Sequence, residues 1–149
     1  MNSTPILKGK HAVVFGAGGS IGSAVAKEFA AGGAEVFLSG RTKSNIEAVA
    51  NEVVAKGGRA HAATIDTTDD GAVNEYIDGI VKQTDKIDII LDAARPLAKI
   101  MKTKACCGLA DRPVHGAIET MVKSRFITAR AAARRIFKQR SGVIIFRDW

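Results

Sequence analysis

The sequence predicts an α/β fold in which a doubly wound parallel sheet has helices on both faces. Two observations support this prediction. Short apolar runs alternate three times with amphipathic stretches in the first ninety or so residues, and short loops separate them. The first run, His11–Phe15, is apolar without alternating polar positions, which is typical of a strand buried on both faces of a parallel sheet. Strand–helix–strand units of this kind cross over right-handedly. We expect about five strands in the order 3-2-1-4-5.

The predicted elements follow one another along the chain. The first strand is the apolar run His11–Phe15, and the helix after it has Ile21, Val25 and Phe29 at intervals of four before Gly32-Gly33 end it. The same pattern then repeats. The expected strands cover residues 11–15, 35–39, 59–65, 87–91 and 143–146, and the expected helices cover 20–31, 43–56, 70–83 and 116–140. Residues 92–116 have a weaker pattern: Leu97–Lys102 could form one or two helical turns, and Lys104–Val114 shows no clear periodicity.

The two middle helices are predicted from their apolar positions. The second helix has apolar residues on one face and Gly57-Gly58 as its end, and the third has apolar residues at intervals of three and four. The positions are Ile46, Val49, Val53 and Val54 in the second helix, and Val73, Ile77 and Ile80 in the third.

The long helix over 116–140 has an apolar stripe and a basic side. The stripe is Ile118, Val122, Phe126, Ala129, Ala133 and Ile136, and the basic side has Lys123, Arg130, Arg134, Arg135 and Lys138. This helix explains most of the charge asymmetry, since residues 1–75 have 7 Lys/Arg against 8 Asp/Glu (net −1) and residues 76–149 have 15 against 7 (net +8). Its aromatic residues, Phe126 and Phe137, are expected to be buried, so nothing there stacks on bases and we expect no nucleic-acid partner.

A glycine-rich loop lies between the first strand and the first helix. It reads Gly16-Ala17-Gly18-Gly19-Ser20-Ile21-Gly22. Small residues let the backbone turn sharply and approach a pyrophosphate closely, and the N-terminus of the helix then meets the anion with free N–H groups. The strand–loop–helix setting favours a dinucleotide-binding, Rossmann-type domain over a merely structural turn.

The end of the second strand indicates which dinucleotide is bound. A carboxylate there would bind the ribose 2′-hydroxyl of NAD. This chain instead has Ser39-Gly40-Arg41-Thr42, and the planar cation of Arg41 suits a 2′-phosphate. The cofactor is therefore predicted to be NADP, with NAD less favoured.

The loop resembles the G-x-x-x-G-x-G motif of the short-chain dehydrogenase/reductase family. Gly16 and Gly22 match the first and last glycines, and Ser20 replaces the middle one. The resemblance covers Lys10 to Phe146 and implies a single NADP-binding domain over residues 1–149. It also implies that Asp66 binds the adenine amino group, although Asp66 and Asp69 could equally form an Asx turn or a helix cap. The predicted cofactor residues are Gly16, Gly18, Gly19, Ser20, Ile21, Gly22, Arg41, Asp66 and Ala94.

The chain departs from the family after the fourth strand. The family has Asn-Asn-Ala-Gly there, whereas this chain has Asp92-Ala93-Ala94-Arg95, and only Ala94 matches. The family's catalytic serine and Tyr-x-x-x-Lys would follow the fifth strand, and the chain stops before them. Tyr76, its only tyrosine, is expected on a surface helix and has Ile80 where the lysine would be needed.

The resemblance therefore implies a hydride-transferring oxidoreductase truncated before its catalytic residues and before the last strands of the family fold. We expect weak NADP binding at most and no turnover by this chain alone, with no catalytic residues to assign. The fifth strand would then be an exposed edge. The alternative is a non-catalytic nucleotide-binding or protein-interaction module.

The remaining residues indicate no other chemistry. Cys106 and Cys107 are adjacent, without the spacing of a metal site, and the three histidines fall on separate elements, so no metal is expected. No signal peptide or membrane span is apparent, and we expect a cytoplasmic protein with no membrane partner. The family resemblance makes the helix over 116–140 a possible contact between copies of the chain.

Overall fold

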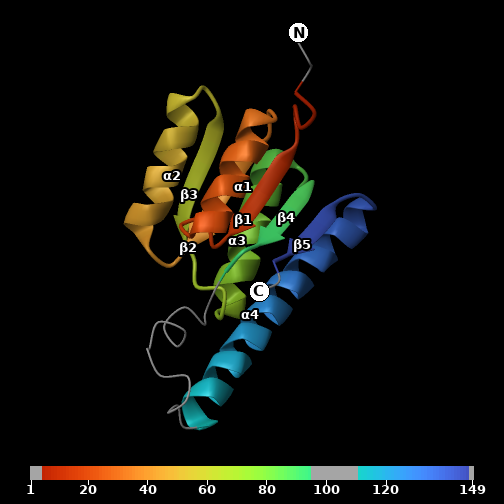
Figure 1. Cartoon of the computed structure of the whole chain (residues 1–149). Coiled ribbons are helices and arrows are strands. Elements are labelled where there is room, and N and C mark those ends of the chain that lie inside the picture. Colours follow the sequence, from red (N-terminus) through yellow and green to blue (C-terminus); the bar gives the residue numbers. More distant parts are fainter. Residues whose placement is uncertain (1–4, 95–110, 148–149) are drawn as a thin grey trace.

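The computed structural model describes residues 5–94 and 111–147 of the chain, and only the backbone of residues 111–114. Five parallel strands form one sheet in the order β3-β2-β1-β4-β5, which confirms the predicted fold and topology (Figure 1). The strands are β1 (His11–Phe15), β2 (Glu35–Gly40), β3 (Arg59–Thr64), β4 (Ile89–Asp92) and β5 (Val143–Phe146). The helices are α1 (Ser20–Ala31), α2 (Lys43–Ala55), α3 (Asp70–Thr84) and α4 (Asp111–Gln139).

Helices cover both faces of the sheet, so the core has two halves. On one face α1 and α2 pack through Ala26 and Ile46 against Val14 and Leu38. On the other face α3 and α4 pack through Ile77 and other residues against Val13, Phe15 and Phe37. Successive residues of a strand point to opposite faces, and in the central strands β1 and β2 both faces are buried, which is why these two strands are nearly uninterrupted apolar runs.

The long helix differs from its prediction in both extent and orientation. It begins at Asp111, five residues before the expected start at Gly116. Most of the predicted apolar stripe faces outward, since Ile118, Val122 and Phe126 are 47%, 57% and 60% exposed, whereas Ile136 packs against the core. The neighbouring Phe137 is 86% exposed. The prediction that the rings of Phe126 and Phe137 are buried is therefore wrong. The buried side consists of small and hydroxyl-bearing residues with one isoleucine: Ala117, Ser124, Ile127, Thr128, Ala131 and Ala132. Two stripes with helical spacing lie side by side on α4, and the more polar of them packs on the sheet.

Tyr76 lies on a helix outside the sheet, as predicted, and its side chain faces the core. It belongs to α3, and its ring packs edge-on against Phe15, with 6.0 Å between the ring centroids. Its hydroxyl is buried, and this burial raises the pKa of Tyr76 well above its usual value. The side chain is therefore part of the core on the α3 side of the sheet.

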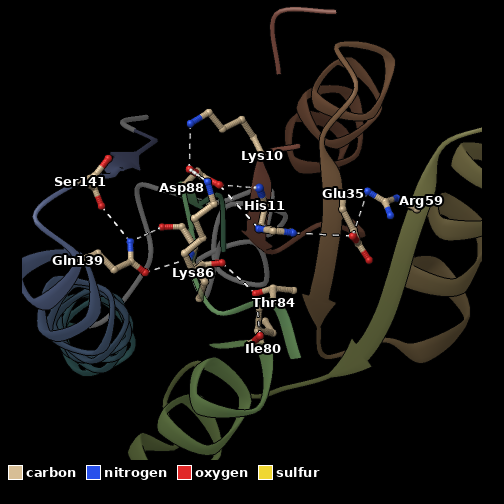
Figure 2. A network of polar contacts seen from close by, with 11 residues as sticks. Lys10, His11, Glu35, Arg59, Ile80, Thr84, Lys86, Asp88, Gln139 and Ser141 are labelled. Carbon is tan, nitrogen blue, oxygen red and sulfur yellow. Dashed lines mark hydrogen bonds and ion pairs between the residues drawn. The ribbon is translucent and has the colours of Figure 1, made fainter. Parts of the chain in front are cut away.

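A network of polar contacts joins the amino ends of the strands (Figure 2). Asp88, just before β4, accepts hydrogen bonds from the backbone N–H of His11 at 2.9 Å and from the ammonium of Lys10 at 3.1 Å. Glu35, at the start of β2, lies 3.3 Å from the guanidinium of Arg59. Burial raises the pKa of Asp88, but the bonds from His11 and Lys10 outweigh burial and hold that pKa below its usual value. These contacts fix the edge of the sheet opposite the glycine loop.

The strand β5 lies at one border of the sheet. It pairs with β4 through four residues, and Val143, Ile145 and Phe146 are 53%, 39% and 39% exposed. Within the described residues, β4 is the one strand paired with β5, as expected for an exposed edge. No helix in the described part of the chain is long and apolar enough to cross a bilayer.

Two adjacent valines of α2 test the orientation of that helix. Val53 is 2% exposed, whereas Val54 is 56% exposed, although the sequence placed both on the buried face. We expect Val53→Ala to lower the free energy of unfolding by about 2 kcal/mol, because it leaves a cavity. Val54→Ala should change it by less than about 0.5 kcal/mol. Urea denaturation of both variants measures the difference, and equal losses would contradict this orientation.

Candidate functional site

The carboxyl edge of the sheet contains a cavity of about 640 Å³. Loops after all five strands contribute to it, together with one residue from α4. All nine predicted cofactor residues line it: Gly16, Gly18, Gly19, Ser20, Ile21, Gly22, Arg41, Asp66 and Ala94. The volume is in the range of small-molecule sites. Segments far apart in the sequence meet here because the carboxyl ends of parallel strands share one edge.

Two glycines of the loop are required by the packing of the protein itself. Gly16 has φ +76°, and a Cβ there would lie 2.6 Å from the backbone nitrogen of Ala94. A Cβ on Gly22 would lie 2.3 Å from the carbonyl oxygen of Gly16. Both positions exclude any side chain, because the loop is pressed between α1 and the end of β4. The backbone N–H groups of Gly16 and Ala17 both donate to the carbonyl of Ser39, which ties the loop to β2.

The N-terminus of α1 is the main anion-attracting feature of the cavity. Its N-cap residue is Gly19, which has no side chain to cap the helix, and the first turn has no acidic residue. By contrast, Asp69 caps α3 by accepting a bond from the N–H of Ala72 at 3.0 Å. The first N–H groups of α1 therefore lack side-chain partners in the described chain, and the helix dipole adds positive potential there. A Cβ at Gly19 would meet only the Gly16 carbonyl, at 3.5 Å, so the loop leaves space above it.

Two loops beside the glycine loop carry charged side chains. Arg41 follows β2 and is exposed, and no carboxylate of the described residues forms an ion pair with it. Asp66 follows β3, and its Oδ1 accepts bonds from the N–H and the hydroxyl of Thr68 at 2.9 and 2.8 Å. These bonds hold the pKa of Asp66 below its usual value, and the charges of Arg41 and Lys123 lower it further. Asp66 thus forms the predicted turn, while Asp69 is the helix cap.

Helix α4 fastens these loops through its buried polar residues. The hydroxyl of Ser124 donates to Thr67 Oγ1 at 2.6 Å, next to Asp66. The hydroxyl of Thr128 lies 2.6 Å from Asp92 Oδ2 at the end of β4. Asp92 Oδ1 accepts the N–H of Ala94 at 3.0 Å. The loops after β3 and β4 are therefore anchored to the same helix.

Some lining residues were not anticipated from the sequence. Thr120 comes from α4 and Arg147 follows β5, and neither lies in a motif. Thr42 and Asn45 extend the Arg41 segment into the start of α2.

In the described part of the chain, the lining includes no tyrosine, histidine, lysine or cysteine. His11 and His61 lie on β1 and β3 near their amino ends, and His115 lies on α4. Arg95, Cys106 and Cys107 lie outside the described residues.

Asp92 gives a test of how the site is anchored. This carboxyl group is 2% exposed and forms no ion pair within the described chain. In Asp92→Asn the side-chain amide N–H could donate to the hydroxyl oxygen of Thr128. The hydroxyl hydrogen of Thr128 would then point to the carbonyl oxygen of Ser124, which lies 3.1 Å from that hydroxyl. Both present partners of Asp92 would keep a hydrogen bond without a buried acid, so we expect equal or higher stability, by up to about 2 kcal/mol. Asp92→Ala should lower the stability by about 1–3 kcal/mol.

Chemical denaturation of both Asp92 variants checks this expectation. If Asp92→Asn lost as much stability as Asp92→Ala, the proposed hydrogen bond from the asparagine amide to Thr128 would be contradicted.

Comparisons with known proteins agree with this fold. A sequence model described as short chain dehydrogenase matches residues 10–147. The 3-oxoacyl-acyl-carrier-protein reductase of Chlamydia pneumoniae is 27% identical over 139 residues, which are 93% of this chain and 54% of that protein. A short-chain type dehydrogenase/reductase from Mycobacterium marinum has a TM-score of 0.81 and 29% identity, over 96% of this chain and 57% of its own.

A metagenomic short-chain oxidoreductase solved in complex with NADP is similar as well. Its TM-score is 0.77 and its identity 27%, over 94% of this chain and 62% of that one. The chain thus spans little more than half the length of these relatives. The family model covers nearly all of the chain, and the chain belongs to the short-chain dehydrogenase family.

Proposed function

We propose that the cavity at the carboxyl edge binds NADP(H). The observation that carries this proposal is the uncapped N-terminus of α1 beside the exposed guanidinium of Arg41, both lining one cavity. The N–H groups of the loop and of α1 would hold the pyrophosphate. Arg41 would hold the 2′-phosphate, with Thr42 and Asn45 at the start of α2 beside it.

The choice of NADP over NAD rests on the end of β2. Among the lining residues Asp66 is the one carboxylate, and it follows β3 rather than β2. With no carboxylate after β2 to bind a ribose 2′-hydroxyl or to repel a phosphate, Arg41 favours the phosphorylated form. The metagenomic relative solved with NADP supports the same choice.

Asp66 can serve the adenine end of the cofactor. Its Oδ1 is engaged by Thr68, and within the described residues no hydrogen bond reaches Oδ2. A carboxylate held in this way can accept a hydrogen from the adenine amino group through Oδ2. Asp66 would thus use Oδ1 for the turn and Oδ2 for the contact with the adenine.

We also propose that the protein takes part in hydride transfer between a nicotinamide cofactor and a carbonyl or alcohol substrate, as its family implies. The dinucleotide supplies the hydride when it is bound. The described lining residues bind and orient the cofactor. Their carboxylate, Asp66, follows β3 on the adenine side, and they include no tyrosine, histidine, lysine or cysteine to exchange the substrate proton. By themselves these residues constitute a nucleotide-binding module, which is the alternative function.

Thermal denaturation with ligand tests the cofactor assignment. NADP should raise the Tm more than NAD at equal concentration, because binding to the native state stabilises it. Arg41→Ala should reduce the affinity for NADP by about tenfold or more and leave that for NAD nearly unchanged. The control is Lys43→Ala, which removes a neighbouring cation that does not line the cavity. Equal shifts with both dinucleotides in the wild type would contradict the preference for NADP.

The outward face of α4 is proposed as a contact between copies of the chain. Ile118, Val122, Phe126 and Phe137 are 47%, 57%, 60% and 86% exposed on one side of this helix. Large apolar side chains grouped in this way mark interaction surfaces. We expect the chain to self-associate and the double variant Val122→Glu/Phe137→Glu to be monomeric in sedimentation equilibrium. The control, Val54→Glu on α2, should associate like the wild type, and a monomeric wild type would contradict the proposal.

A further inference from the structure

A second arginine, Arg147, lines the cavity on the side opposite Arg41. The strand order places the loops along the carboxyl edge in a fixed sequence. Asp66 follows β3, Arg41 follows β2, Gly16 follows β1, Ala94 follows β4 and Arg147 follows β5. The glycine loop therefore lies between two cationic residues, with three strand spacings separating β2 from β5. At about 4.8 Å a spacing, these two strands are roughly 14 Å apart.

The backbone of Arg147 is held firmly in place. Its N–H donates to the carbonyl of Asp92 at 3.1 Å, which extends the pairing of β5 with β4 by one residue. Its carbonyl accepts a hydrogen bond from the guanidinium of Arg125 on α4. The residue is half-buried, and no carboxylate of residues 5–94 and 115–147 forms an ion pair with it. The backbone is thus fixed at this side of the cavity, and the cationic side chain starts from it.

The position of this charge matters for a dinucleotide. In a doubly wound sheet a dinucleotide lies across the point where the strand order reverses, with one nucleoside on each side. Here that point lies between β1 and β4. With the 2′-phosphate on the Arg41 side, the nicotinamide nucleoside lies on the side of β4 and β5. The nicotinamide ring has one positive charge when oxidised and none when reduced.

We propose that Arg147 makes the cavity select the reduced dinucleotide over the oxidised one. This proposal rests on the proposed NADP(H) site. At a separation of about 10 Å and an effective dielectric constant between that of a protein surface and that of water, any two like charges change a binding constant by roughly three- to twentyfold. The expected preference for NADPH over NADP⁺ is of this size. Arg147 acts here as a specificity residue, since it distinguishes two charge states of one ligand.

The test compares three ligands by isothermal titration calorimetry. NADPH has a neutral ring, NADP⁺ has a charged ring, and 2′-phospho-ADP-ribose has no ring. In Arg147→Gln the ratio of the two dissociation constants, NADP⁺ over NADPH, should fall by roughly three- to twentyfold. Arg147→Lys should keep most of the wild-type ratio, because it keeps the charge. The control is Arg134→Gln, which removes an exposed cation of α4 that does not line this cavity.

The outcomes separate this proposal from the one on which it rests. If Arg147 only attracted phosphates or only stabilised the fold, Arg147→Gln would weaken all three ligands by the same factor, and an unchanged ratio would overturn the proposal. If the folded wild type bound none of the three ligands, the NADP(H) site itself would be overturned, and this inference with it. Circular dichroism of each variant establishes that it is folded.

Discussion

The contact between Gly16 and the backbone after β4 is the constraint on which the candidate site depends. A Cβ at Gly16 would lie 2.6 Å from the nitrogen of Ala94, so the two segments approach as closely as main chains can. The same loop donates two N–H groups to the carbonyl of Ser39 on β2. Three strand ends are thereby joined without any side chain between them. The N-terminus of α1 is aimed over this junction, and the cavity takes its shape from it.

Helix α4 supports this junction through hydrogen bonds from its hydroxyl groups. Ser124 and Thr128 are each 1% exposed and bond to Thr67 and Asp92, which lie beside the loops that line the cavity. A hydrogen bond fixes direction as well as distance, whereas an apolar contact would let the loops slide. This requirement explains why Ser124 and Thr128 are buried on the sheet side of α4, among alanines and Ile127.

Much of the fold and part of the site could be predicted from the sequence. The strands had runs of buried-type residues, and Gly16, Gly22 and Arg41 are in local motifs whose geometry depends on a few neighbouring residues. All nine predicted cofactor residues line one cavity for that reason. Thr120 and Arg147 could not be found in this way, because their place in the cavity depends on the position of α4 and on the register of β5. The orientation of α4 was missed because Ser124 and Thr128 count as polar in any hydrophobic pattern, although both are buried.

The open border at β5 has a consequence for the behaviour of the chain in concentrated solution. Within the described residues no strand pairs with its outer side, so the backbone donors and acceptors there form an incomplete ladder, flanked by side chains of Val143, Ile145 and Phe146 that remain partly accessible. Any extended segment of matching hydrophobicity can complete such a ladder, since main-chain bonding does not depend on sequence. Chains that meet at this border would therefore join through continuous sheets. Light scattering that rises with protein concentration, together with growing β-sheet absorbance in the infrared, would be the signature of this route.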